Sequence, residues 1–138
     1  MRSPAGSWRA VGGWAVLILI ATTVPLKDLA LRAPVPWLDK LVHGSLYLVL
    51  GWLVGAALRA SGRCRVGARA SALLALSVFA LLDEVHQRWV PGRVASLEDW
   101  VADVVGATIG LAAGMILWKS APATEADGAS RQGNEEEI

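Results

Sequence analysis

Apolar residues are grouped along this chain in long blocks rather than in amphipathic stripes. The first two blocks contain 17 uncharged residues between Arg9 and Lys27 and 18 between Lys40 and Arg59. Each block is close to the ~20 residues that an α-helix needs to cross a bilayer. The pattern therefore predicts that both blocks are transmembrane helices.

The third and fourth blocks are too short to cross a membrane without their charged neighbours. Their charge-free stretches, residues 70–82 and 104–118, amount to only ~20 and ~22 Å of helix against a hydrocarbon core of ~30 Å. To span, the third helix must include Asp83 and Glu84, and the fourth must include Asp103. We therefore predict helices over residues 9–26, 38–59, 69–90 and 98–118.

Charge in the loops orients these helices. The loop of residues 59–69 contains four arginines and no acid, so the positive-inside rule places it in the cytoplasm. Both termini then face the cytoplasm by parity, and the polar, acidic segment 119–138 has too little apolar surface to order. With 54% hydrophobic residues, we expect one domain over residues 1–118, an all-α four-helix transmembrane bundle with cytoplasmic termini and a disordered C-terminal tail.

The first block has a second interpretation, as a cleaved signal peptide. An arginine-bearing start, an apolar centre and small residues near Ala30 and Ala33 fit such a leader. No clean Ala-x-Ala cleavage site follows, so we interpret the block as the first transmembrane helix. An intact-mass measurement distinguishes the two interpretations.

Composition and motifs argue against several classes of function. Cys64 is the only cysteine, so neither an internal disulfide nor a thiolate metal site can form. The basic residues are spread through the loops, which argues against a nucleic-acid partner. The sequence contains no glycine-rich phosphate loop, His-Glu-x-x-His pair or serine elbow. We expect no cofactor and no bound metal, and we assign no catalytic residue.

Ionisable residues gather at the predicted outward ends of the second, third and fourth helices. Asp39 and His43 are four residues apart and share a helix face, and Asp83 shares a face with His86 and Gln87. A carboxylate in the apolar margin of a membrane costs free energy unless it is paired or reaches water, so the clustering indicates a functional pocket. The predicted pocket residues are Asp39, Lys40, His43, Asp83, Glu84, Gln87, Arg93, Ser96, Asp99 and Asp103.

Structural roles explain some of these residues equally well. Ser96 and Asp99 have the spacing of a helix N-terminal cap, with Asp in place of the usual Glu or Gln. Lys40 can be an anchor that reaches the membrane interface, and His43 can be an interhelical hydrogen-bonding residue. Other residues resist such explanations best, because adjacent acids inside a span have no packing value: Asp83, Glu84, Gln87, Arg93 and Asp103.

Small residues recur at a spacing of four on two helices. Glycines at this spacing let another helix backbone approach closely. We predict that the second and fourth helices pack through these faces and bring the acidic turns together. The glycines are Gly51 and Gly55 on the second helix and Gly106, Gly110 and Gly114 on the fourth.

Two segments of the chain resemble the VanZ-like family of membrane proteins. They are DKLVHGSLYLVLGWL, starting at Asp39, and DEVHQRWVPGRVASLEDWVADVVGATIG, starting at Asp83. The sequence departs from the family pattern at Asp103, where Asn is commoner. The resemblance implies a four-helix integral membrane protein of the bacterial envelope, hence a multi-pass protein of the inner membrane, in a family named for a member that lowers susceptibility to teicoplanin. It implies no reaction.

The first functional hypothesis is a binding or transport-like envelope protein. Its outward-facing pocket would hold a cell-wall precursor, a lipid head group or a glycopeptide, with Arg93 and Lys40 contacting an anionic group. The expected partners are thus the lipid bilayer and such a ligand, and the oligomeric state stays open.

The second hypothesis is an intramembrane hydrolase acting on a lipid-linked phosphate. His43 or Glu84 would be the general base and Arg93 would stabilise the developing charge. A metal-assisted version would use His43, Glu84, His86 and Asp103. A small multidrug transporter, which also has four short helices, is a third hypothesis. Such transporters have an essential acid in the first helix, whereas the first helix here contains none between Arg9 and Lys27, so this hypothesis is disfavoured.

Overall fold

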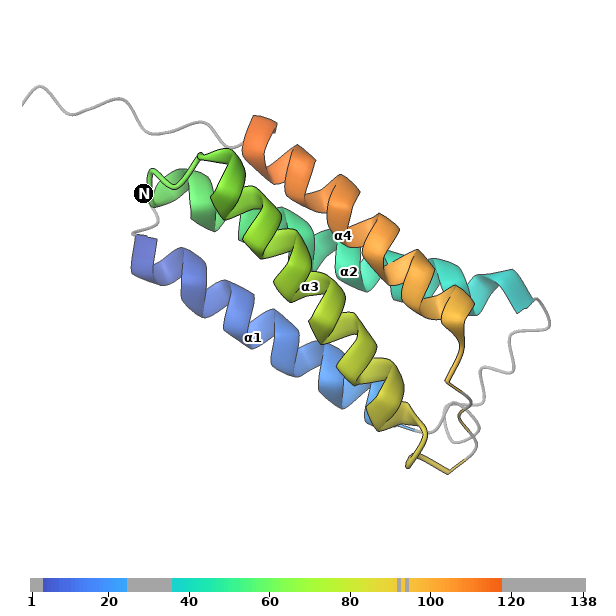
Figure 1. The fold of residues 1–138 in the computed structure, drawn as a ribbon. Coiled ribbons are helices and arrows are strands. Elements are labelled where there is room, and N and C mark those ends of the chain that lie inside the picture. The colour runs from blue at the N-terminus through green and yellow to red at the C-terminus, as the bar shows by residue number, and fades with distance from the viewer. Residues whose placement is uncertain (1–3, 25–35, 92, 94, 118–138) are drawn as a thin grey trace, which may run out of the picture.

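The structure, a computed structural model, describes residues 4–24, 36–91, 93 and 95–117 (Figure 1). The prediction of an all-α, four-helix fold is confirmed, because the described residues form four helices and each is long and apolar enough to cross a membrane. The predicted disordered tail, residues 119–138, lies outside the described residues. The helices are α1 (Pro4–Thr23), α2 (Pro36–Ala60), α3 (Val66–Gln87) and α4 (Leu97–Leu117).

Two helices end three residues earlier than the sequence predicted, and a proline explains the end of the first. Helix α1 ends at Thr23, where the sequence continues with Val24 and Pro25, and a residue before proline disfavours the helical conformation. Helix α3 ends at Gln87, and tight turns follow in which the amide of Val90 donates to the Gln87 carbonyl at 3.0 Å. The chain thus leaves α3 four residues before Pro91.

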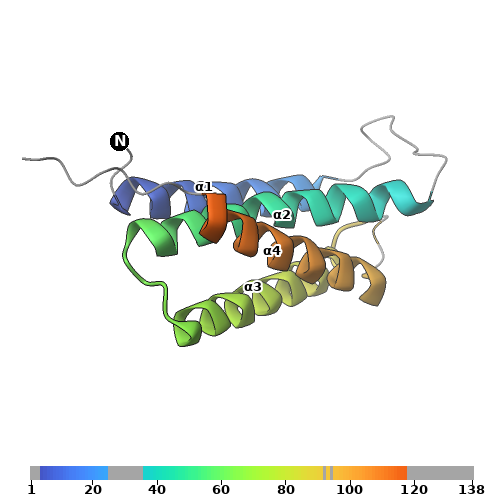
Figure 2. The ribbon, with the colours of Figure 1, turned by 90° about the horizontal axis from the view of Figure 1, so that it is seen from above.

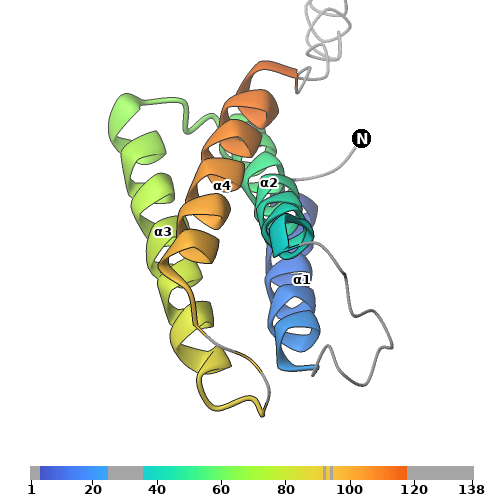
Figure 3. The ribbon, with the colours of Figure 1, turned by 90° about the vertical axis from the view of Figure 1, so that its right-hand side faces the viewer.

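Helices α2 and α4 form the central pair of the bundle. Helix α1 packs mainly on α2, and α3 packs mainly on α4, so the pair is flanked on two sides (Figures 2 and 3). Consecutive helices run in opposite directions (Figure 1). The C-terminal ends of α1 and α3 therefore lie at the same end of the bundle as the N-terminal ends of α2 and α4, which we call the polar end.

Glycines bring the backbones of α2 and α4 into direct contact. A Cβ atom at Gly51 would overlap the backbone of Ala107, and one at Gly110 would overlap the backbone of Leu48. At Gly106 it would overlap the backbone of Gly44. Such approaches are closer than any side chain permits, so these positions require glycine and fix the register of the two helices.

Apolar side chains both fill the bundle and cover it. Ile18, Leu50 and Leu111 are buried between the helices, whereas Leu74 and Ile116 are 68% and 76% exposed on the outside. An exterior of this kind suits lipid rather than water. Together with the four apolar helices, it fits a multi-pass membrane protein.

Candidate functional site

Buried polar side chains meet at the polar end of the bundle. They come from all four helices, and the carboxyl groups of Asp83 and Asp103 are fully buried. Burying a carboxylate is costly unless it is paired or hydrogen-bonded. The other polar side chains buried at this end are Thr22, His43, Glu84, Gln87 and Asp99.

Asp83 is held by hydrogen bonds from three helices. The Thr22 hydroxyl of α1 donates to Oδ1 at 2.7 Å, and the Tyr47 hydroxyl of α2 donates to Oδ2 at 3.4 Å. The Gln87 amide, one turn further along α3, donates to Oδ2 at 3.5 Å. Both oxygens of this acid therefore have partners, and Asp83 joins α1, α2 and α3.

Glu84, the next residue, points to the start of α4 instead. Its Oε2 accepts the backbone N–H of Ser96 at 2.9 Å, and the Ser96 hydroxyl accepts the N–H of Glu98 at 3.2 Å. Ser96 thus caps α4 as its spacing suggested. The reciprocal carboxylate of the cap comes from α3 rather than from Asp99.

A second group of buried residues, which we call the carboxylate–histidine cluster, consists of His43, Glu84 and Asp103. Nδ1 of His43 lies 3.6 Å from Oδ1 of Asp103 and 4.0 Å from Oε1 of Glu84. One ligand-type atom from each residue lies within 4.8 Å of the others. Among the described residues, neither oxygen of Asp103 nor Oε1 of Glu84 has a hydrogen-bond partner. Three helices thus direct two acids and an imidazole to one point.

Arg93, in the connection between α3 and α4, lies beside this cluster. Its Nη1 is 3.5 Å from Nε2 of His43 and donates to Oε1 of Gln87 at 3.5 Å. Its Nη2 donates to the carbonyls of Ala21 and Val24 at 3.4 Å each, while its buried Nε has no hydrogen-bond partner among the described residues. Because these bonds are long and Nε has no partner among the described residues, the guanidinium has N–H groups that could donate to an anion.

Lys40 forms a separate ion-pair group at the edge of the site. Its Nζ lies 2.6 Å from Oε2 of Glu98 and 3.2 Å from Oδ1 of Asp99. These two acids stand in the first turn of α4, where negative charge also suits the helix dipole. The structure therefore does not bring Lys40 and Asp99 into the carboxylate–histidine cluster.

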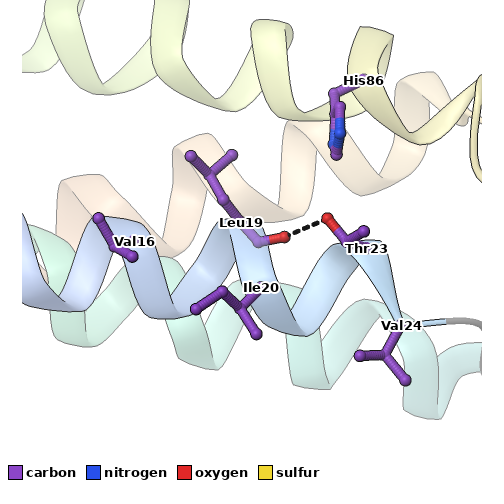
Figure 4. A pocket seen from close by; sticks show the side chains of 6 residues that line it. All are labelled: Val16, Leu19, Ile20, Thr23, Val24 and His86. Carbon is purple, nitrogen blue, oxygen red and sulfur yellow. Dashed lines mark hydrogen bonds between the residues drawn. The ribbon is translucent and has the colours of Figure 1, made fainter.

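The structure separates some residues that sequence spacing grouped together and adds others. His86, which the spacing placed on the face of Asp83, is also turned toward α1, but it lines an apolar groove there and is not one of the buried polar residues (Figure 4). Asp39 lies in the first turn of α2, but its side chain is outside the described part of the chain. Thr22 was not among the predicted pocket residues, and nothing in its uncharged block distinguishes it from Thr23.

An apolar groove lies between α1 and α3, and one of its lining residues, Val24, is hydrogen-bonded to Arg93. Its volume is about 400 Å³, and His86 is its one ionisable lining residue (Figure 4). The Nδ1 atom of His86 is buried and has no hydrogen-bond partner among the described residues. Val24 lines the groove and its carbonyl accepts a hydrogen bond from Arg93, so the guanidinium lies next to a residue of the groove lining. The other lining residues are Val16, Leu19, Ile20 and Thr23.

Comparison with known proteins identifies the family. The VanZ/LLP1 family matches residues 8–118, which include all four helices except the first four residues of α1, and every residue of the polar end. No curated protein and no solved structure matches the chain. With most of its length matched, and with four helices able to span a bilayer, this chain is a multi-pass membrane protein that belongs to the VanZ/LLP1 family.

Proposed function

We propose that this protein binds a lipid-linked, anionic cell-wall precursor at the polar end of the bundle. The phosphate group would contact Arg93, and the hydrocarbon chain would lie in the groove between α1 and α3. The single observation that carries the proposal is that Val24 joins the two features: it lines the apolar groove and its carbonyl accepts a hydrogen bond from Arg93. An amphipathic ligand needs such a junction of apolar surface and cationic donor.

Two further features support Arg93 as the anion contact. Its hydrogen bonds to protein are long, at 3.4 to 3.5 Å, so a phosphate can replace them with short charge-assisted bonds. Lys40, the other cation considered, is already held by Glu98 and Asp99. By the positive-inside rule applied to the arginine-rich loop 59–69, the polar end faces outward from the inner membrane, where precursors and glycopeptides meet.

Lipid binding by the purified protein tests this proposal. The protein in nanodiscs is titrated with a polyprenyl phosphate and with the matching uncharged polyprenol. Arg93→Gln removes a charge-assisted contact worth ~1.5 to 3 kcal/mol, so we expect affinity for the phosphate to fall at least about 10-fold while the polyprenol is unaffected. Arg88→Gln is the matched control, because Arg88 is an exposed arginine at the same end of α3. Equal affinity of the two lipids for the parent protein would rule the proposal out.

The convergence of His43, Glu84 and Asp103 supports a second candidate, an intramembrane hydrolase of lipid-linked phosphates. His43 or Glu84 would activate water, and Arg93 would stabilise charge on the phosphate oxygens, since its Nη1 lies 3.5 Å from His43. Release of inorganic phosphate from a polyprenyl diphosphate distinguishes this candidate from simple binding. Release that persists in a Glu84→Gln, His43→Gln double variant would exclude a role for the cluster.

A further inference from the structure

The carboxylate–histidine cluster and the neighbouring Asp83 together contain more negative charge than the cation beside them balances. Asp83, Glu84 and Asp103 contribute three buried carboxylates, and Arg93 contributes one guanidinium beside them. Asp83 accepts three hydrogen bonds, whereas both oxygens of Asp103 and one of Glu84 accept none from the described residues. A buried charge of this kind is stable only when something neutralises it.

The unsatisfied atoms are aimed at one another across three helices. Oδ1 of Asp103 and Oε1 of Glu84 lie 3.6 and 4.0 Å from Nδ1 of His43, and all three ligand-type atoms fall within 4.8 Å. Ligands held at ~2.0 to 2.2 Å from a transition-metal ion are separated by ~3 to 4.4 Å, depending on the coordination angle. The three side chains therefore need only small rotations to share one ion.

We infer that His43, Glu84 and Asp103 bind a divalent transition-metal ion, with Zn²⁺ and Mn²⁺ as the ions that fit the donors best. One imidazole nitrogen and two carboxylate oxygens form a mixed set that these ions accept, whereas Ca²⁺ and Mg²⁺ prefer oxygen alone. The ion's two positive charges match the excess left by three carboxylates and one guanidinium. With three protein ligands, the site keeps a coordination position for water or for a ligand oxygen.

Contacts outside the cluster hold the proposed metal ligands in place. Oε2 of Glu84 accepts the Ser96 N–H at 2.9 Å, which leaves Oε1 directed at the cluster. Gly44, the residue after His43, lies against the backbone of Ala102, the residue before Asp103, so the glycine contact between α2 and α4 sets the ligand spacing. Supporting contacts of this type orient metal ligands in proteins.

Arg93 is the group that must adjust. An ion on Nδ1 of His43 leaves the proton on Nε2, which then cannot accept from Nη1 of Arg93 at 3.5 Å. The guanidinium keeps its alternatives, Gln87 at 3.5 Å and the two carbonyls at the end of α1. Arg93 carries positive charge beside the ion, so Arg93→Gln should tighten metal binding while it weakens phosphate binding.

Metal titration of the purified protein tests the site without any lipid ligand. Detergent-solubilised protein is stripped with a chelator and titrated with Zn²⁺ and Mn²⁺ by calorimetry, with metal content measured by elemental analysis. We expect one ion per chain, and at least a ~10-fold loss of affinity in Asp103→Asn, because removing a ligand costs at least as much as removing its supporting contacts. Glu98→Gln is the matched control, an acid at the start of α4 that pairs with Lys40 outside the cluster.

A second readout keeps the inference falsifiable if Asp103→Asn does not fold. Saturating Zn²⁺ should raise the unfolding temperature of the parent and of Glu98→Gln, and should raise it less in Glu84→Gln, which retains the side-chain volume. Substoichiometric metal together with equal affinities in the parent, Asp103→Asn and Glu84→Gln would overturn the inference. Protonation of the buried carboxyl groups would then be what neutralises their charge. This outcome is independent of polyprenyl phosphate binding, so the failure of one proposal does not conceal the failure of the other.

Discussion

Replacing Thr22 by valine should reveal how strongly α1 is tied to the buried acids. The substitution keeps the side-chain shape and removes the hydroxyl that donates to Asp83 at 2.7 Å. Both residues are buried, with Thr22 2% exposed and Asp83 fully buried, so water cannot replace the lost bond.

The magnitude follows from the type of bond. Hydrogen bonds to charged groups contribute ~1.5 to 3 kcal/mol in proteins, whereas polar bonds between membrane helices average ~0.6 and reach ~1.7 kcal/mol. The Thr22–Asp83 bond is short and its carboxylate is shielded from water, so we expect its contribution to lie where these two ranges overlap. We expect Thr22→Val to lower the free energy of unfolding by ~1.5 kcal/mol.

Thr23→Val is the matched control. Each threonine has a carbonyl of its own helix within hydrogen-bonding distance, that of Ile18 at 3.0 Å for Thr22 and that of Leu19 at 2.6 Å for Thr23. Thr23 is exposed, however, and contacts no acid among the described residues. Unfolding of the protein in mixed micelles by increasing dodecyl sulfate, followed by the fluorescence of its seven tryptophans, gives the free energy for each variant. Equal losses in the two variants would refute the claim that Thr22 stabilises the buried carboxylate.

Three further substitutions have distinct expected outcomes in the same unfolding assay. Gly110→Ala should destabilise the protein by ~1 to 3 kcal/mol, because its Cβ would overlap the backbone of α2, whereas Gly12→Ala, which has open space around it, should leave stability unchanged or slightly higher. Tyr47→Phe removes a longer bond to Asp83 and should cost only ~0.5 kcal/mol, so a loss as large as that of Thr22→Val would contradict the geometry. Lys40→Met should have a smaller effect than Thr22→Val, and the effect should vanish at about 1 M salt, since screening removes interfacial ion pairs.

The sequence was informative where a physical constraint left few alternatives. The charge-free stretches beside Asp83 and Asp103 are too short to cross a bilayer, so the acids had to enter the helices, and the described α3 and α4 contain them. The spacing of the glycines likewise pointed to α2 and α4 as close neighbours, and the structure places Gly51 and Gly110 at their contact. Both arguments depend only on the number of residues between two positions on one helix, and the sequence gives that number directly.

The rest of the site depends on how each helix is rotated, which spacing alone does not determine. Thr22 and Thr23 are chemically identical, and only the packing of α1 decides that Thr22 reaches Asp83. Adjacent residues of α3 are divided in the same way: Asp83 faces α1 and α2, and Glu84 faces α4. The contribution of α1 to the site was therefore invisible in its uncharged block.

The most direct test of the account is a disulfide between α2 and α4 beside the cluster. A Cβ at Gly44 would lie 4.0 Å from that of Ala102, within the ~3.5 to 4.5 Å that a disulfide requires, and these residues adjoin His43 and Asp103. In a Cys64→Ser background, membranes that contain Gly44→Cys with Ala102→Cys are oxidised, and the remaining thiols are counted by maleimide labelling and mass spectrometry. The account predicts near-complete loss of both thiols in this pair. In the control pair, Gly44→Cys with Val101→Cys, the second cysteine is at an exposed position, and both thiols should be labelled in full. Two free thiols in the Gly44–Ala102 pair after oxidation would contradict the register that places His43 beside Asp103.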